Sequence, residues 1–251
     1  MREIMTSGII LGYSVQKEYD RFVSIFTRTY GKIRATAKFA QKPSSPFVGR
    51  LDKTNICKLS LYKSTKGNFT IRQCVLEKTF QKARNDILRF ALIEGVTEIA
   101  DKLTYQHYGM KKYFTLIEEA MSAIEALEKP YLIYLIFKIK FLDMAGIVPS
   151  FKHCMMCNKK IEIGDIVAWN IENLICNSCL QEKQSKLQGN TFEPNMLKLV
   201  NFAMKNDYEK TLQIKTSKED IEFLEAIISE IWHGHNLPQI NSDKVISSLH
   251  L

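Results

Sequence analysis

The sequence predicts a multi-domain α+β protein, in which a small N-terminal β-domain precedes a helical domain with an inserted four-cysteine zinc module. Short β-type segments separated by turn residues fill the first 80 residues. After Asn85 the apolar residues follow a helical period, and two Cys-x-x-Cys pairs interrupt that region. We therefore expect one domain over residues 1–80 and a helical domain over 81–251, with the zinc module at about 151–182.

Five segments of the first domain are rich in Ile, Val, Phe, Tyr or Thr, which are typical of β-strands. Turn formers separate these segments, among them Gly31, the run 42–46 and Gly67. The expected strands are Ser7–Val15, Arg21–Arg28, Lys32–Ala40, Thr54–Tyr62 and Asn68–Leu76. Five short strands with little helical pattern between them favour a small closed barrel or a sandwich. A five-stranded barrel of the oligonucleotide-binding type (OB-fold) fits the arrangement.

The third expected strand alternates between apolar and cationic residues. Side chains two residues apart share a face, so one face carries Ile33, Ala35, Ala37 and Phe39 and the other carries Lys32, Arg34, Thr36 and Lys38. We expect the apolar face in the core and the cationic face towards solvent or a ligand. Among the nearby aromatic residues, Phe22 and Phe26 should fill the barrel, while Tyr30 and Phe47 are open to either role.

All of the excess positive charge lies in the first third of the chain. Residues 1–80 carry a formal balance of +10 and the remaining 171 residues carry −2, and no acid occurs between Asp20 and Asp52. Such asymmetry indicates a polyanion as partner, although a basic surface that serves only solubility is the alternative. The cations that we expect to contact nucleic-acid phosphates are Arg28, Lys32, Arg34, Lys38, Lys42, Arg50 and Arg72.

The second domain reads as helices on either side of the cysteines. The expected helices cover residues 85–103, 111–128, 130–146, 194–205 and 218–232. The third is apolar nearly all round and should be the central helix of a bundle. Thr216 and Ser217 are the candidate caps before the last helix, with Glu219 and Asp220 set for a capping box. His233 and His235 at the end of that helix are better explained as a cap region than as a metal pair.

Four cysteines form a C-x₂-C-x₁₈-C-x₂-C pattern, consisting of Cys154, Cys157, Cys176 and Cys179. Each pair can supply two corners of a tetrahedron around Zn²⁺, and a hairpin with turns at Gly164-Asp165 and Glu172-Asn173 would bring the pairs together. A closed four-sulfur shell leaves no position for water, so we expect a structural zinc ion. A redox pair and an iron–sulfur cluster remain as alternatives. Cys57 and Cys74 should be buried thiols.

Several function classes lack their sequence signatures. Neither G-x-x-x-x-G-K-[ST] nor G-x-G-x-x-G occurs, and the serine elbow and the H-E-x-x-H zinc helix are also absent. We therefore expect no catalytic residues and no enzymatic activity. The longest strongly apolar run, Tyr131–Phe137, is too short to span a bilayer, and no secretion signal is evident. We expect a cytoplasmic protein with reduced cysteines and no membrane partner.

Three segments, in their order along the chain, resemble the bacterial RecO family of recombination mediators. These are Phe26–Ile33 with Ala37-Lys38, then Leu142–Pro149 followed by Cys154-x-x-Cys157, and the closing segment Lys244–Leu249. The sequence departs from the family at Phe39-Ala40-Gln41-Lys42, where a second glycine and arginines are usual.

The resemblance implies an N-terminal OB-fold barrel and a helical domain with a four-cysteine zinc module. It also implies binding of single- and double-stranded DNA, annealing of complementary strands, and partnership with RecR. Contact with the acidic tail of single-stranded-DNA-binding protein would allow RecA to be loaded on coated DNA. Nucleoid association in a bacterial cytoplasm, without nucleotide hydrolysis, follows from the same likeness. The alternatives are a zinc-ribbon RNA-binding or transcription-associated protein, a metal-dependent nuclease or nucleotidyl enzyme, and a pure scaffold.

Overall fold

The structure of the 251-residue chain is a computed structural model. The structure describes residues 2–16, 18–104, 110–148, 153–161, 167–170, 173–182, 190–192 and 194–250. The expected turn at Gly164-Asp165 lies outside these residues, as do Pro149, the start of the predicted zinc module and Glu172.

The chain separates into two compact units, residues 1–131 with 238–251, and residues 132–237. Since the first unit joins the β-strands to several helices, a domain boundary near residue 80 stays a prediction. No helix in the described part of the chain combines the length and apolar character needed to cross a membrane.

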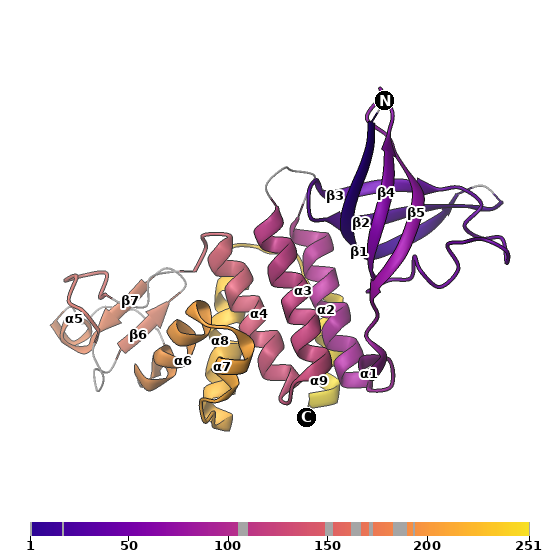
Figure 1. The fold of residues 1–251 in the computed structure, drawn as a ribbon. Helices are drawn as coiled ribbons and strands as arrows, with labels where there is room; N and C mark the ends of the chain where they lie inside the picture. Colours follow the sequence, from indigo (N-terminus) through magenta and orange to yellow (C-terminus); the bar gives the residue numbers. More distant parts are fainter. Residues whose placement is uncertain are drawn as a thin grey trace. The chain divides into compact units, whose positions relative to one another are not determined.

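Five strands close into a barrel at the N-terminal end of the chain, drawn in indigo to purple in Figure 1. They are β1 (Arg2–Gln16), β2 (Asp20–Thr27), β3 (Gly31–Ala37), β4 (Ile56–Lys63) and β5 (Phe69–Lys78). Their order is β1-β2-β3-β5-β4, with β4 also paired to β1. The β3–β5 pair is parallel and the others are antiparallel. The expected five-stranded OB-fold barrel is confirmed.

The alternation of apolar and polar residues in β3 places its apolar side chains in the barrel core. Ile33, Ala35 and Ala37 are at most 2% exposed, and they pack with buried residues of the other four strands. Gly8 allows β1 to approach its neighbours, because a Cβ at this position would lie 2.6 Å from Cγ2 of Ile25 and 2.8 Å from Cδ1 of Leu59. An added methyl group would therefore overpack the barrel.

Three of the expectations for the aromatic residues were wrong. Phe22 is only half-buried and is not part of the barrel core. Phe26 is fully buried, but it stacks outside the barrel on Phe114 of α3, with ring centroids 6.2 Å apart. Phe39 is 56% exposed instead of buried. It lies beyond the end of β3 and has φ 56°, so the alternation of the strand no longer applies to it. Tyr30 and Phe47, left open by the sequence, belong to the barrel core.

Helices complete the first unit. They are α1 (Gln81–Arg84), α2 (Ile87–Leu103), α3 (Lys111–Ala126) and α9 (Asn241–His250). Helix α2 packs against the other three helices and also contacts β1. Its first turn is capped by Asp86, whose carboxylate accepts a hydrogen bond from the backbone N–H of Arg89 at 3.1 Å. Two residues of β2 contact these helices: Phe26 stacks on Phe114 of α3, and the Ser24 hydroxyl donates a hydrogen bond to Oδ1 of Asp101 on α2 at 3.4 Å.

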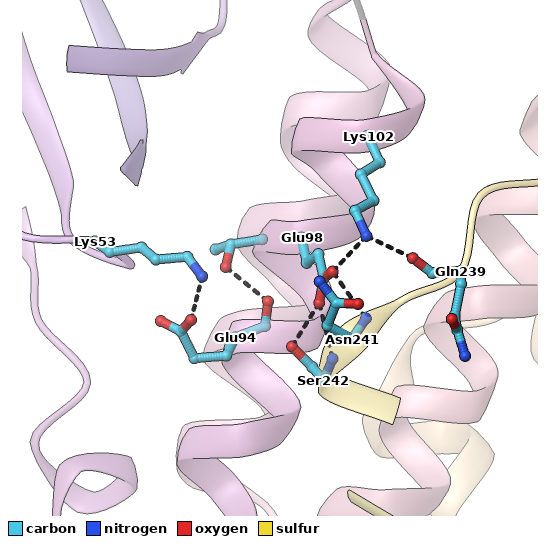
Figure 2. A network of polar contacts seen from close by, with 8 residues as sticks. Lys53, Glu94, Glu98, Lys102, Gln239, Asn241 and Ser242 are labelled. Atoms are coloured by element: carbon cyan, nitrogen blue, oxygen red, sulfur yellow. Dashed lines mark hydrogen bonds and ion pairs between the residues drawn. The ribbon is translucent and has the colours of Figure 1, made fainter. Parts of the chain in front are cut away.

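A carboxylate on α2 holds the start of α9 (Figure 2). Glu98 accepts hydrogen bonds from the backbone N–H groups of Asn241 and Ser242, at 2.8 and 2.9 Å, and from the Ser242 hydroxyl at 2.7 Å. It also pairs with Lys102, whose Nζ lies 2.7 Å from Oε1. Unpaired N–H groups at a helix start favour a negative charge, so Glu98 fixes the C-terminal helix to α2.

The second unit contains the remaining helices and a small sheet. The helices are α4 (Pro130–Met144), α5 (Asn177–Glu182), α6 (Pro194–Lys205), α7 (Tyr208–Leu212) and α8 (Lys218–Gly234). The unit begins at Leu132, so the first two residues of α4 belong to the first unit. The strands are β6 (Val167–Asn170), β7 (Asn173–Cys176) and β8 (Asn190–Phe192). The sheet order is β7-β6-β8.

The helical pattern of the sequence is confirmed in this unit. Helix α4 is buried nearly all round between Leu132 and Leu142, in agreement with its apolar sequence. The capping box of Ser217 and Asp220 is present at the start of α8. The C-cap of the same helix is His235, as its sequence indicated.

Candidate nucleic-acid interface and four-cysteine site

A groove of about 410 Å³ opens on the barrel beside the end of β3. Its walls come from residues 38–39, the following loop up to Phe47, and residues 70–72 of β5. The parallel pairing of β3 with β5, which matches Ala35 with Phe69 and Thr36 with Thr70, brings these distant segments together. The topology of the barrel thus makes the groove.

The groove is cationic. Lys38, Lys42 and Arg72 are exposed and line it, and no carboxylate occurs among its described lining residues. Arg72 lies at a register shift between β4 and β5, and its guanidinium carbon is 5.3 Å from the ring centroid of Tyr62. Three positive charges around one hollow make a favourable site for a phosphate chain. The structure brings together three of the seven cations selected from the sequence.

Two other selected cations face carboxylates of the helices. Nη2 of Arg28 lies 2.8 Å from Oε2 of Glu118, and Nζ of Lys32 lies 2.7 Å from Oδ1 of Asp101. Arg28 also sits above the Phe114 ring at 4.8 Å. Their charges are largely offset inside the first unit, so they attract a phosphate chain less strongly than the groove cations do. The offsetting carboxylates, Glu118 and Asp101, lie far from Arg28 and Lys32 in the sequence. A count of charges along the chain could not reveal these ion pairs.

The remaining two cations, Arg34 and Arg50, lie outside the groove. Arg34 is exposed on β3 opposite Ser24 of β2. Arg50 is exposed as well, but its Nη1 donates a hydrogen bond to the carbonyl of Cys74 at 2.9 Å. This bond gives Arg50 a role in joining its loop to β5.

Sequence reasoning missed two aromatic residues beside the groove cations. The alternation of the third expected strand predicts Phe39 in the core, and no sequence pattern singles out Tyr19. Nζ of Lys42 lies 4.9 Å from the ring centroid of Phe39 and 5.0 Å from that of Tyr19. A signal for Phe39 was available, because it stands between Lys38 and Lys42 in the acid-free cationic segment.

The four selected cysteines lie together in the second unit. Their sulfur atoms are all within 4.8 Å of one another, and Sγ of Cys157 is 3.7 Å from Sγ of Cys176. Tetrahedral Zn–S bonds of about 2.3 Å imply sulfur–sulfur distances of about 3.8 Å. The donor set and its spacing therefore fit a tetrahedral metal ion.

Local backbone geometry forms each half of this site. Cys154 and Cys157 lie in the loop that the antiparallel bridge between His153 and Lys160 closes, and Asn158 turns the chain there with φ 57°. Cys176 ends β7, and α5 carries Cys179 one turn later. The backbone N–H of Cys176 points to Sγ of Cys154 at 3.4 Å. Both knuckles thus present their sulfurs inward to one point.

The pKa values of two of these thiols are shifted in opposite directions. Burial raises the pKa of Cys154, but backbone N–H groups of Cys176, Cys157 and Met156 outweigh it and bring the pKa to about 6. The hydrogen bond of Cys179 to Cys157, followed by burial, raises the pKa of Cys179 to about 12. A cation among the sulfurs would favour the thiolate form of all four.

The second unit also carries a groove of about 670 Å³ between α6 and the segment leading into α8. Leu199, Phe202 and Ile214 give it apolar walls, and Lys205 and Lys215 flank them. Asp220 lines it too, but its carboxylate accepts the N–H of Ser217 in the capping box. The groove combines apolar surface with positive charge.

Comparison with known proteins agrees with this architecture. The family description "Recombination protein O N terminal" matches residues 1–80, and "Recombination protein O C terminal" matches residues 84–244. A protein named DNA repair protein RecO from Thermoanaerobacter sp. is 22% identical over 250 residues, covering 99% of both chains. Its namesakes from Caldanaerobacter subterraneus and Listeria monocytogenes are 25% and 22% identical, covering 94% and 96% of this chain and 94% and 93% of their own. Because the two family descriptions together span nearly the whole chain, the protein belongs to the RecO family.

Proposed function

We propose that this protein is a mediator of DNA repair and homologous recombination. It binds single- and double-stranded DNA, anneals complementary strands and, with RecR, helps load RecA onto DNA coated by single-stranded-DNA-binding protein. In this role the protein binds and aligns DNA strands and has no catalytic centre. Family membership supports the role, and the cationic groove on the barrel carries the proposal for this chain.

The groove explains annealing through charge. Complementary strands repel each other through their phosphates, and a cationic surface that holds one strand lowers this repulsion for the second. Phosphate contacts carry no sequence information, so any pair of complementary strands qualifies. We place Lys38, Lys42 and Arg72 at the centre of the contact, with Arg34 and Arg50 as outer contacts and Arg28 and Lys32 as minor ones.

Strand annealing without nucleotide tests the proposal. Two fluorescently labelled complementary oligonucleotides are mixed with wild-type protein or with the double variant Lys38→Gln, Arg72→Gln across a salt series. The matched control is Lys58→Gln, Lys66→Gln, which removes two exposed barrel cations that are not among the groove's lining residues. We expect faster annealing with wild type and control, and a loss of most of that acceleration with the groove variant.

Equal annealing by all three proteins would reject the groove as the site. Stronger binding of folded RNA than of single-stranded DNA in competition would favour the alternative, a zinc-ribbon RNA-binding or transcription-associated protein. Product formed from labelled DNA with added magnesium would contradict the absence of catalysis.

We further propose that the four cysteines hold a structural Zn²⁺ ion. Four thiolates complete a tetrahedral shell, so the metal would fold the segment that joins Cys154 to Cys179 and leave no site for water. Such binding contributes on the order of 10 kcal/mol to folding of a small segment. Metal analysis of purified protein should give one zinc per chain, and an iron signal with visible absorption would favour a cluster instead.

The acidic tail of single-stranded-DNA-binding protein is the proposed partner of the second unit. The groove beside α6 supports this, because Lys205 and Lys215 can attract acids while Phe202 and Ile214 receive apolar side chains. Replacing both lysines by Glu should abolish binding of the tail peptide and leave binding of naked oligonucleotides unchanged. Unchanged peptide binding would place that partner elsewhere.

A further inference from the structure

Phe39 combines two features that packing alone does not explain. Its side chain is 56% exposed although it is aromatic, and its φ of 56° lies in the left-handed region that side chains with a Cβ rarely adopt. Strained, exposed residues of this kind gather at ligand sites, where the surrounding structure holds them in place.

Specific contacts hold Phe39 in this conformation. Its backbone N–H donates to Oδ1 of Asp20 at 2.8 Å, and its carbonyl accepts from the N–H of Lys42 at 3.1 Å. The N–H of Gln41 donates to the carbonyl of Tyr19 at 3.0 Å. The segment after β3 is thereby fastened to the β1–β2 hairpin, which carries Tyr19. The ring of Phe39 is presented to solvent by a fixed backbone.

The surroundings of Phe39 combine aromatic rings with cations. Lys42 lies within 5.0 Å of the ring centroids of both Phe39 and Tyr19, and Tyr19 is 38% exposed. Phe39 also lines the groove together with Lys38 and Arg72. An accessible ring thus stands directly beside the three charges that the proposed function assigns to phosphates.

A nucleobase is the ligand that suits this arrangement. Every base has an aromatic face that can stack on a protein ring, while the adjoining phosphates meet nearby cations. In a duplex the bases are already stacked on one another, and their faces are not available to the protein. A ring beside a phosphate-binding groove therefore distinguishes unpaired from paired strands.

We propose that Phe39, assisted by Tyr19, is a base-stacking platform that gives the groove its preference for unpaired DNA. This inference rests on the proposed function and adds a recognition element to the same site. Lys38, Lys42 and Arg72 supply affinity for any strand, and Phe39 supplies affinity that requires a free base.

Three probes separate the two contributions: a short labelled oligothymidylate, an oligomer of the same length made of abasic residues, and a duplex. Phe39→Leu keeps an apolar side chain but removes the ring, and Phe39→Trp keeps a ring. Stacking of one base is worth a roughly 5- to 150-fold change in affinity. We expect Phe39→Leu to lose this much affinity for oligothymidylate and to keep wild-type affinity for the abasic oligomer and the duplex. Phe39→Trp should bind all three probes nearly as wild type does.

The possible failures are distinguishable. If wild type binds oligothymidylate in a salt-dependent way but Phe39→Leu binds it equally well, the platform is rejected and the groove stands. An equal loss on all three probes would also reject stacking, because abasic strands have no base. If wild type binds none of the probes, the proposed function itself fails.

A second variant tests whether Phe39 is kept for packing. Asn tolerates the left-handed conformation better than Phe does, so Phe39→Asn relieves the backbone strain while it removes the ring. We expect a Tm equal to or above that of wild type together with the same loss of oligothymidylate affinity. A lowered Tm with unchanged affinity would show that Phe39 serves the fold and would overturn the proposal.

Discussion

Glu98 makes the stability of the first unit depend on pH. Burial raises the pKa of this carboxyl, but the hydrogen bonds from Lys102, Asn241 and Ser242 outweigh burial and lower it from 4.5 to about 2. The side chain is 12% exposed, so solvent screens these bonds little. A lowering of this size corresponds to about 3 kcal/mol of folding free energy at pH 7.

The direction of the pH effect follows from the lowered pKa. The contribution is complete above about pH 5, where the carboxyl is ionised in both folded and unfolded chains. It falls to roughly 1.4 kcal/mol at pH 3 and is lost as the pH approaches 2. Glu98→Gln removes the charge but keeps a carbonyl acceptor, so we expect it to cost about 1–3 kcal/mol at pH 7 and less than half as much at pH 3.

Hydrogen exchange on α9 is the suitable assay. Both tryptophans, Trp169 and Trp232, belong to the second unit, so tryptophan fluorescence does not report on this contact. Peptides covering residues 241–250 should lose roughly 5- to 100-fold protection in Glu98→Gln at pH 7. The matched control, Glu119→Gln on an exposed position of α3, should keep wild-type protection. Equal protection in all three proteins, or a loss that does not shrink at pH 3, would refute the reasoning.

Further predictions concern the barrel and the cysteine site. Gly8→Ala should lower Tm through a loss of about 1–3 kcal/mol, because its methyl group meets Ile25 and Leu59, and an unchanged Tm would contradict the close packing. Arg28→Gln should weaken DNA binding less than Lys38→Gln does, since Glu118 already offsets the charge of Arg28; the reverse order by fluorescence anisotropy would move the site towards α3. Cys176→Ser should release the bound zinc and increase proteolysis within the cysteine segment, and full zinc occupancy in that variant would reject the four-cysteine shell.

The periodicity of the hydrophobic residues and the positions of turn-forming residues were sufficient to predict most of the fold. The alternation of Ile33, Ala35 and Ala37 identified the core face of β3, because the three residues lie within one regular strand. The Cys-x-x-Cys spacing identified all four sulfur donors, because each pair lies within one turn of chain. These features are local, and local sequence therefore suffices for them.

Non-local contacts account for what the sequence did not reveal. Phe26 was placed inside the barrel because nothing near it in sequence indicates that Phe114 covers the outer face of β2. Helix α9 has a polar sequence, and its attachment depends on Glu98, more than 140 residues earlier. Phe39 was misplaced because a turn ends the strand two residues before it.

The salt dependence of single-stranded DNA binding tests the central claim most directly. If Lys38, Lys42 and Arg72 each neutralise one phosphate, the three groove cations together should contribute about −2 to the slope of log affinity against log salt. Lys38→Gln, Arg72→Gln removes two of these contacts and should make the slope shallower by about 1.4, and Lys58→Gln, Lys66→Gln should leave it at the wild-type value. The same slope in wild type and in the groove variant would mean that phosphates bind elsewhere on the protein.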